Sequence, residues 1–266
     1  MIGLAAFTLW QRELQRFFRQ PSRVAGAIGT PLVFWLFMGS GLAGSFRMPG
    51  ATAAGAQGVS YLQFFFPGTI ALVLLFAAIF STISVIEDRH EGFLQGVLVA
   101  PVSRGAIVAG KVLGGATLAW LQGVVFLFLA PLAGIPLTLR SLLESAGVLA
   151  LLAISLTAIG FGFAWKVDSV QGFHAVMNVV LLPMWLLSGS FFPLAGAPFW
   201  LGLLMRANPL TYGITALRGT LALSSTSPMS TSSVASVPMI PLAITAALAL
   251  LAFAADLVVT RGGRVE

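Results

Sequence analysis

The sequence predicts an all-α membrane protein in which one amphipathic helix precedes six membrane-spanning helices, all within a single domain of residues 1–266. Hydrophobic residues make up 58% of the chain and charged residues only 8%, against about 25% in soluble domains. Each apolar run is long enough to cross a hydrocarbon core of about 30 Å. The runs lie at 24–43, 64–86, 107–134, 142–165, 172–192 and 237–258.

The N-terminal segment 1–22 is too polar to span a membrane, but it is amphipathic. Arg12, Arg16 and Arg19 fall on one helical face, and the opposite face carries Leu4, Phe7, Trp10, Leu14, Phe17 and Phe18. This pattern predicts a retained helix that lies in the membrane interface and ends at Pro21. The alternative is a soluble helix packed on a partner protein.

Basic residues predict the orientation. An even number of spans places both termini on one side, and that side holds ten of the fourteen Lys and Arg residues. The positive-inside rule therefore makes it cytoplasmic. The four basic residues left on the outside are Arg47, Arg140, Arg206 and Arg218.

The composition argues against most catalytic, metal-binding and nucleic-acid-binding sites. The chain has no cysteine and only two histidines, so we predict no catalytic residue and no metal site. Its scattered basic residues do not form a nucleic-acid groove. Residues 105–112 match G-x-x-x-x-G-K, but Val112 stands where a hydroxyl would bind Mg²⁺. We interpret Gly110 and Gly114 as a packing face.

The predicted spans also lack a proton relay. Glu144 lies four residues from Arg140, and Asp256 lies five residues from Arg261, so each acid has a basic neighbour. His174 has no matching serine motif, which disfavours a membrane enzyme. A passive or externally driven pathway remains, as does an assembly scaffold without transport.

Two segments have sequence patterns that a simple membrane anchor would not require. The loop 87–104 begins with charged residues and continues as a short apolar helix, which suits a groove on a soluble partner or a position against the bilayer or the spans. The segment 188–222 is apolar and broken by prolines. It predicts short external helices that re-enter the outer leaflet, or an ordinary surface loop.

These segments resemble the permeases of type-2 ABC exporters. The resemblance rests on Ser-Gly-x-Phe-Phe-Pro at 188–193, on Asn-Pro-Leu-Thr-Tyr at 208–212 followed by Arg218, and on the charged loop that leads to Pro101-Val102-Ser103-Arg104. It covers essentially the whole chain. It implies the type V exporter arrangement, with an interfacial helix, six spans and re-entrant external helices between spans five and six.

The resemblance also implies partners and a location. It implies a multi-pass permease in the bacterial cytoplasmic (inner) membrane, paired with a second permease copy as a homodimer or heterodimer. Two ABC ATPase subunits would carry ATP and Mg, and this chain would bind no cofactor. The expected cargo is a hydrophobic or amphipathic, drug-like or lipid-like molecule. A lipid-linked polysaccharide or lipo-oligosaccharide is the alternative.

The same resemblance implies two groups of site residues. Residues implied to couple to the ATPase are Glu87, Asp88, Arg89, Glu91, Phe93, Leu94, Val97 and Pro101. Those implied to form an exit-side gate are Ser188, Gly189, Phe191, Phe192, Pro193, Asn208, Pro209, Tyr212 and Arg218. The chain departs from many relatives at Gln95 and Gly96, where a Glu-Arg pair is common, so the ion pairs that would join it to an ATPase are open.

Overall fold

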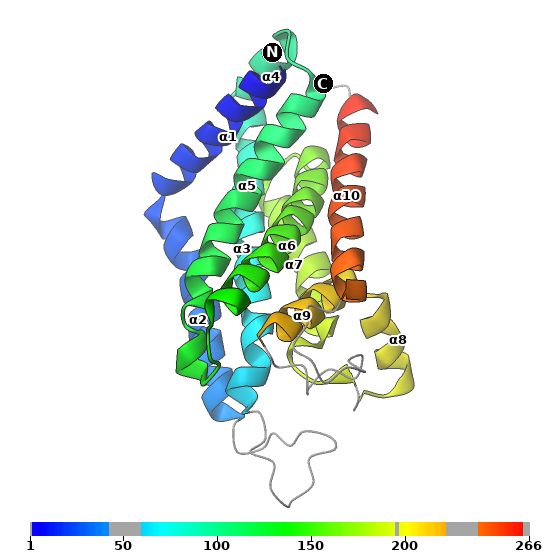
Figure 1. Ribbon diagram of the computed structural model, residues 1–266. Coiled ribbons are helices and arrows are strands. Elements are labelled where there is room, and N and C mark those ends of the chain that lie inside the picture. Colours follow the sequence, from blue (N-terminus) through cyan, green and yellow to red (C-terminus); the bar gives the residue numbers. More distant parts are fainter. Residues whose placement is uncertain (1, 43–59, 195–196, 222–238, 263–266) are drawn as a thin grey trace, which may run out of the picture.

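The computed structural model describes residues 2–42, 60–194, 197–221 and 239–262, and within these residues it is helical without a β-strand. The long helices form one bundle. One end carries α4 (Phe93–Val99), and the other carries α8 (Phe199–Ala207) and α9 (Pro209–Thr220) (Figure 1). We call these the α4 end and the α9 end. The predicted all-α class is confirmed.

Five helices of the described chain are long and apolar enough to cross a membrane. The helix expected to be the first span, α2 (Pro21–Gly41), has a shorter apolar stretch over Ala25–Gly41. The sixth span therefore stays a prediction. The five helices are α3 (Tyr61–His90), α5 (Arg104–Leu127), α6 (Leu139–Lys166), α7 (Val170–Trp185) continued by η2 (Leu186–Ser190), and α10 (Met239–Gly262).

Side-chain caps fix where several helices begin. Ser60 and Gln63 form a capping box at the start of α3, and Thr138 and Ser141 form another at the start of α6. The Ser103 hydroxyl accepts a hydrogen bond from the Ala106 amide and so begins α5. The expected run 107–134 is shorter than predicted, because α5 ends at Leu127 and the 3₁₀ turn η1 (Ala130–Ala133) follows.

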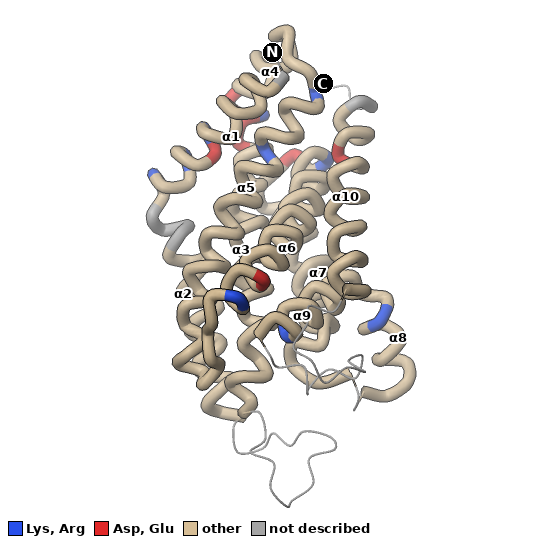
Figure 2. Tube along the Cα trace, viewed as in Figure 1, with Lys and Arg blue, Asp and Glu red and all other residues tan. Residues whose placement is uncertain are grey.

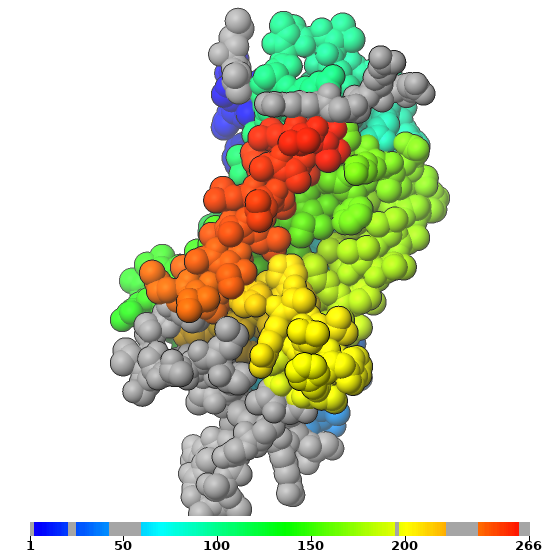
Figure 3. Space-filling view, turned by 90° about the vertical axis from the view of Figure 1, so that its right-hand side faces the viewer, coloured from blue at the N-terminus to red at the C-terminus, as the bar shows by residue number. Residues whose placement is uncertain are grey.

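Helix α3 forms the centre of the core. In the most apolar 18-residue stretch of α3, 89% of the residues are buried in the bundle, and Phe64, Phe65 and Phe66 are fully enclosed. By contrast, only 22% of the corresponding stretch of α7–η2 and 17% of that of α10 are buried. Figure 3 shows α10 at the surface, with α8 near its lower end. Apolar outer faces of this kind are what lipid contact requires.

The amphipathic helix α1 (Ile2–Phe18) packs along the half of α5 nearest the α4 end (Figure 1). Glycines permit the contact: a Cβ on Gly110 would lie 2.6 Å from Leu9 Cβ, and one on Gly114 would lie 2.8 Å from Glu13 Cβ. The predicted packing face of Gly110 and Gly114 is confirmed, and its partner is α1. Leu4 and Phe7 stay exposed.

Candidate functional site

Charged side chains from three helices meet at the α4 end, where Figure 2 shows most of the charges of the chain. We call the following six residues the ion cluster: Arg12, Glu13 and Arg16 of α1, Glu87 and Asp88 of α3, and Lys111 of α5. Glu13, Asp88 and Lys111 are buried. The pattern predicts that the arginine face of α1 lies opposite the apolar face of a helix in the membrane interface. Arg12 and Arg16 instead point into the bundle toward Asp88, which corrects that expectation.

Asp88 is the centre of the ion cluster. Both Arg12 Nη atoms donate to its carboxylate at 2.7 Å, and Arg16 Nη1 donates at 2.6 Å. Arg16 Nη2 also donates to Glu87 Oε2 at 2.8 Å. The hydrogen bonds from Arg12 to Asp88 raise the pKa of the Arg12 guanidinium above its ordinary value, so this group stays charged.

Lys111 completes the ion cluster from the opposite side. Its ammonium donates to Asp88, to Glu13 Oε1 at 2.5 Å and to Ser84 Oγ at 3.3 Å. Ser84 in turn donates to Glu13 Oε2 at 2.7 Å. Each buried charge thus has an opposite charge and a hydrogen-bond partner, which burial requires. The ion cluster joins α1, α3 and α5 at the base of the loop 87–104.

A second set of bonds ties this base to the turn between α6 and α7. Arg89 donates to the Trp165 carbonyl at 2.5 Å and to Asp168 Oδ1 at 3.1 Å. His90 Nε2 lies 2.6 Å from the Asp168 carbonyl oxygen. Glu87, Asp88 and Arg89, which the resemblance implies as ATPase contacts, therefore make contacts inside this chain, and Asp88 is fully buried.

Helix α4 follows directly after this base. Gly92, with a φ of 75°, turns the chain from α3 into α4, a conformation that favours glycine. Leu94 is buried against the bundle, and Phe93 lies under the Arg12 guanidinium, 3.7 Å from its carbon to the ring centroid. Val97 is half-buried, while Glu91, Pro101 and 89% of Val99 are exposed. The position of Leu94 departs from the expectation that it fills a groove on a partner.

At the α9 end, the last turn of α7 widens into η2 and breaks at Gly189, which has a φ of 80°. Trp185 Nε1 donates to the Gly68 carbonyl of α3 at 2.7 Å. The hydroxyls of Ser188 and Ser190 lie 2.7 Å apart and are buried. The Phe191 ring packs edge-on to Trp185, with centroids 4.9 Å apart. This break is therefore fixed against α3.

Polar side chains satisfy the backbone at the next break, between α8 and α9. Asn208 accepts from the Leu210 amide at 3.0 Å, and its Nδ2 donates to the Met184 carbonyl of α7. Thr211 donates to the Met205 carbonyl at 2.6 Å. Asn208 and Thr211 thus bond backbone groups that the breaks leave without helical partners. Pro209 begins α9, and Tyr212 donates to the Arg206 carbonyl at 2.8 Å.

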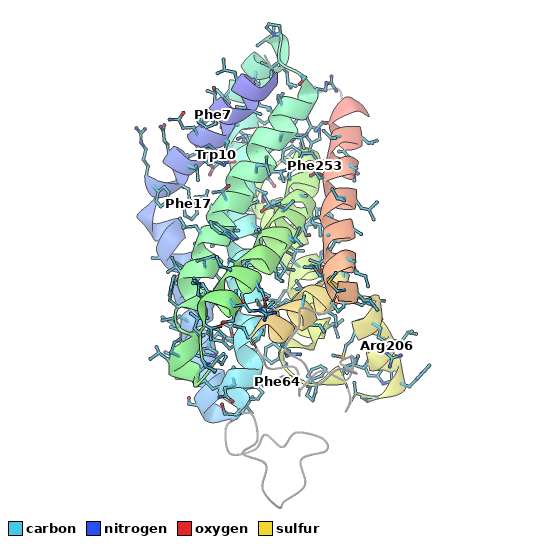
Figure 4. All side chains as sticks on the ribbon, viewed as in Figure 1. Phe7, Trp10, Phe17, Phe64, Arg206 and Phe253 are labelled. Atoms are coloured by element: carbon cyan, nitrogen blue, oxygen red, sulfur yellow. The ribbon has the colours of Figure 1, made fainter. Side chains whose placement is uncertain are left out.

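Arg218 of α9 reaches back to both neighbouring elements. Its Nη2 donates to the Gly189 carbonyl at 2.7 Å and to the Phe64 carbonyl at 3.4 Å. The guanidinium carbon lies 4.3 Å from the centroid of the Phe64 ring. Phe64 lies in the part of α3 nearest the α9 end (Figure 4). The structure thus brings Arg218, Gly189, Ser190 and Asn208 into one region. Phe192 is partly exposed beside it, and Pro193 follows η2.

Sequence reasoning missed Glu13, Ser84 and Lys111 of the ion-cluster region, and Phe64 beside Arg218. A lysine inside an apolar helix and an acid on the flank of an amphipathic helix both require partners, and this requirement is the signal that could have found Lys111 and Glu13. The predicted Arg140–Glu144 pair is confirmed, with Arg140 Nε 2.7 Å from Glu144 Oε1. The Arg261 side chain, expected near Asp256, lies outside the described residues.

Comparisons with known proteins show the family of this chain. Residues 5–222 match the family described as ABC-2 type transporter. The chain is 30% identical to a putative transport permease, ycf38, of Cyanophora paradoxa over 82% of its length and 74% of that protein.

Two further relatives cover a similar share of the chain. The chain is 27% identical to nodulation protein J of Rhizobium leguminosarum bv. viciae over 82% of its length and 83% of that protein. It is also 27% identical to the inner membrane transport permease YadH of Escherichia coli K12 over 86% of its length and 87% of that protein. With its several apolar helices, this multi-pass membrane protein belongs to the ABC-2 type transporter family as a permease subunit.

Proposed function

We propose that this chain is the permease of an exporter that moves a hydrophobic or amphipathic molecule out of the cytoplasm. Two separate ATPase subunits, which carry ATP and Mg, would dock at the α4 end, and a second permease copy would complete the pathway. The α4 end would then face the cytoplasm of a bacterial inner membrane. Family membership and the way the chain presents α4 support this proposal.

The single observation that carries the proposal is the rigid mounting of α4. Its base is fixed to α1 and α5 by the ion cluster and to the α6–α7 turn by Arg89. Leu94 anchors the helix itself. A push on α4 would therefore move several helices together and would not be absorbed by a soft loop. Such coupling needs a rigid element that differs between two states.

The exposed face of α4 defines the docking chemistry. Gln95, Gly96, Val99 and Ala100 are exposed, and none of them is charged. The charged side chains of Asp88 and Arg89 point into this chain. We therefore expect the ATPase to offer an uncharged groove, with Val99 as the central knob. Gln95 and Gly96 replace an ion pair common in relatives, and a neutral contact accounts for that departure.

The broken segment at the α9 end would act as the exit-side gate. Asn208 connects α7 to α9, and Arg218 connects α9 to Gly189 and to α3. A small number of polar bonds thus hold three elements at their breaks, where an unpaired backbone group is costly. Exchange of those bonds would allow the segment to move between two arrangements while the spans stay folded.

Copurification tests the docking role. The permease is expressed with candidate ATPase subunits from the same genome, those encoded beside it first, and is captured from detergent. Val99→Asp places a charge on a side chain that is 89% exposed, so it should abolish ATPase capture without lowering permease stability. Leu139→Asp is the matched control, because Leu139 is 73% exposed near the opposite end of the bundle. Capture of the ATPase by the Val99→Asp variant would contradict the proposed face.

A further inference from the structure

The charges of this chain are distributed unequally between its two ends. Seven of the eight Asp and Glu residues lie in α1, in α3 and the turn after it, in the α6–α7 turn, or in the last part of α10 and the residues after it. Those of these segments that the structure describes gather at the α4 end (Figure 2). Glu144 is the only remaining acid. The segments that the structure does not describe between α2 and α3 and between α9 and α10 contain no Asp or Glu.

Glu144 is already engaged. Its Oε1 accepts from Arg140 Nε at 2.7 Å within the same helix. Arg206 lies exposed at the periphery of the α9 end (Figure 4). Arg218, in contrast, is only 6% exposed, and its two hydrogen bonds both go to backbone carbonyls. Its Nε is buried without a hydrogen-bond partner among the described residues.

A buried guanidinium without a carboxylate is unusual, because the desolvation of an ion is costly unless an opposite charge compensates for it. Within the part of the chain that the structure describes, Arg218 has no salt bridge to a carboxylate, and Glu144 is paired with Arg140. A second identical copy would offer the same composition at the same end. The described residues thus leave Arg218 without a compensating anion, and a bound anion from outside the polypeptide would supply one.

We propose that Arg218 binds the anionic headgroup, a phosphate or carboxylate, of an amphipathic molecule at the α9 end. The unpaired Nε–H of Arg218 and its planar guanidinium suit hydrogen bonds to the oxygens of a phosphate or a carboxylate. The partly exposed Leu186 of η2 and Phe192, which flank residues 188–190 in sequence, suit the apolar part of the same molecule. This inference rests on the proposed export function and narrows its cargo to anionic amphipaths. A bilayer lipid with an anionic headgroup would offer the same chemistry.

The test measures binding without ATPase or ATP, so its outcome is independent of the docking experiment. Permease in phosphatidylcholine vesicles is equilibrated with labelled dodecyl phosphate or with the neutral dodecanol, and empty vesicles are subtracted. We expect saturable binding of the phosphate at least about tenfold tighter than that of the alcohol, as hydrogen bonds to charged groups allow. Equal binding of the two probes by the wild-type chain would overturn the proposal.

Variants assign the site. Arg218→Gln keeps a donor but removes the charge, so it should weaken phosphate binding about tenfold or more. Arg218→Lys keeps the charge and should lose less. Arg140→Gln is the matched control, because it removes an exposed arginine of the same end, and it should bind as the wild type does. Wild-type binding by Arg218→Gln would exclude Arg218 as the anion site, and a folded Arg218→Lys variant guards against simple misfolding.

A second arm separates the two sources of the anion. The binding is repeated in vesicles that contain phosphatidylglycerol. If dodecyl phosphate still binds through Arg218, the site selects an exported amphipath over bulk lipid. If phosphatidylglycerol displaces the probe from the wild-type chain and raises its melting temperature, but has neither effect on Arg218→Gln, the occupant is a bilayer lipid.

Discussion

Replacement of Lys111 by methionine tests whether the ion cluster holds α1 to the bundle. Methionine has nearly the volume of lysine but no charge, so Glu13 and Asp88 would stay buried without the ammonium between them. Asp88 would keep both arginines. Glu13 would keep only Ser84 and a distant Arg12, whose Nη1 lies 3.8 Å away. Glu13 is therefore the group that bears the loss.

The expected magnitude follows from this geometry. Removal of one partner from a buried ion pair costs about 3–5 kcal/mol. Because Asp88 stays compensated, we expect the lower value, about 3 kcal/mol. For a chain of this size that corresponds to a fall in melting temperature of about 6–12 °C.

The assay is thermal unfolding in detergent, followed by tryptophan fluorescence. All variants are scanned at one rate, because unfolding of membrane proteins is often irreversible. Glu13→Met combined with Lys111→Met should recover much of the stability, since an apolar pair can replace a buried ion pair. Arg140→Met, which removes an exposed partner, should melt as the wild type does. If Lys111→Met melts as the wild type does, or if the double variant loses the sum of the single losses, the ion cluster does not hold α1.

Three further predictions follow from the packing, the breaks and the orientation. Gly110→Val should lower the melting temperature, because its Cβ would lie 2.9 Å from the Ala6 carbonyl oxygen, whereas Gly147→Val, with nothing within 4 Å, should not. Asn208→Leu removes the hydrogen bond to the Met184 carbonyl and the cap of α9, at a cost of about 1–3 kcal/mol, so it should reduce transport while ATPase capture persists. Asn208→Asp keeps the cap and should transport more than Asn208→Leu does. In this cysteine-free chain, an impermeant maleimide applied to intact cells should label a single cysteine at Pro136 and not one at Ala100, and labelling at Ala100 would reverse the orientation.

Local patterns predicted the helices and the contacts within them. Long apolar runs identified α3, α6, α7 with its continuation η2, and α10 to within a few residues of their observed ends. The spacing of four residues identified the Arg140–Glu144 pair, because such residues are neighbours on any helix. The prolines of segment 188–222 located the breaks of the α9 end, where Asn208 and Thr211 bond the backbone.

The ion cluster could not be predicted in this way, because its members are far apart in sequence. Glu13 and Lys111 are 98 residues apart, and Arg12 and Asp88 are 76 residues apart. A helical pattern also leaves open which neighbour an apolar face meets. Leu94 fits the pattern of a docking face, yet it packs against this chain, and the large hydrophobic side chain that α4 exposes is Val99.

The charge count for orientation and the charge balance of the folded protein answer different questions. Orientation responds to Lys and Arg near the ends of the spans, and acidic residues contribute little. The ten basic residues assigned to the α4 side therefore count in full, although Arg12, Arg16 and Lys111 are matched by carboxylates in the fold. The four assigned to the other side are too few to reverse the chain. Among the described residues, the α9 side has one acidic residue, Glu144, which is already paired with Arg140. The buried charge of Arg218 therefore has no carboxylate partner on that side.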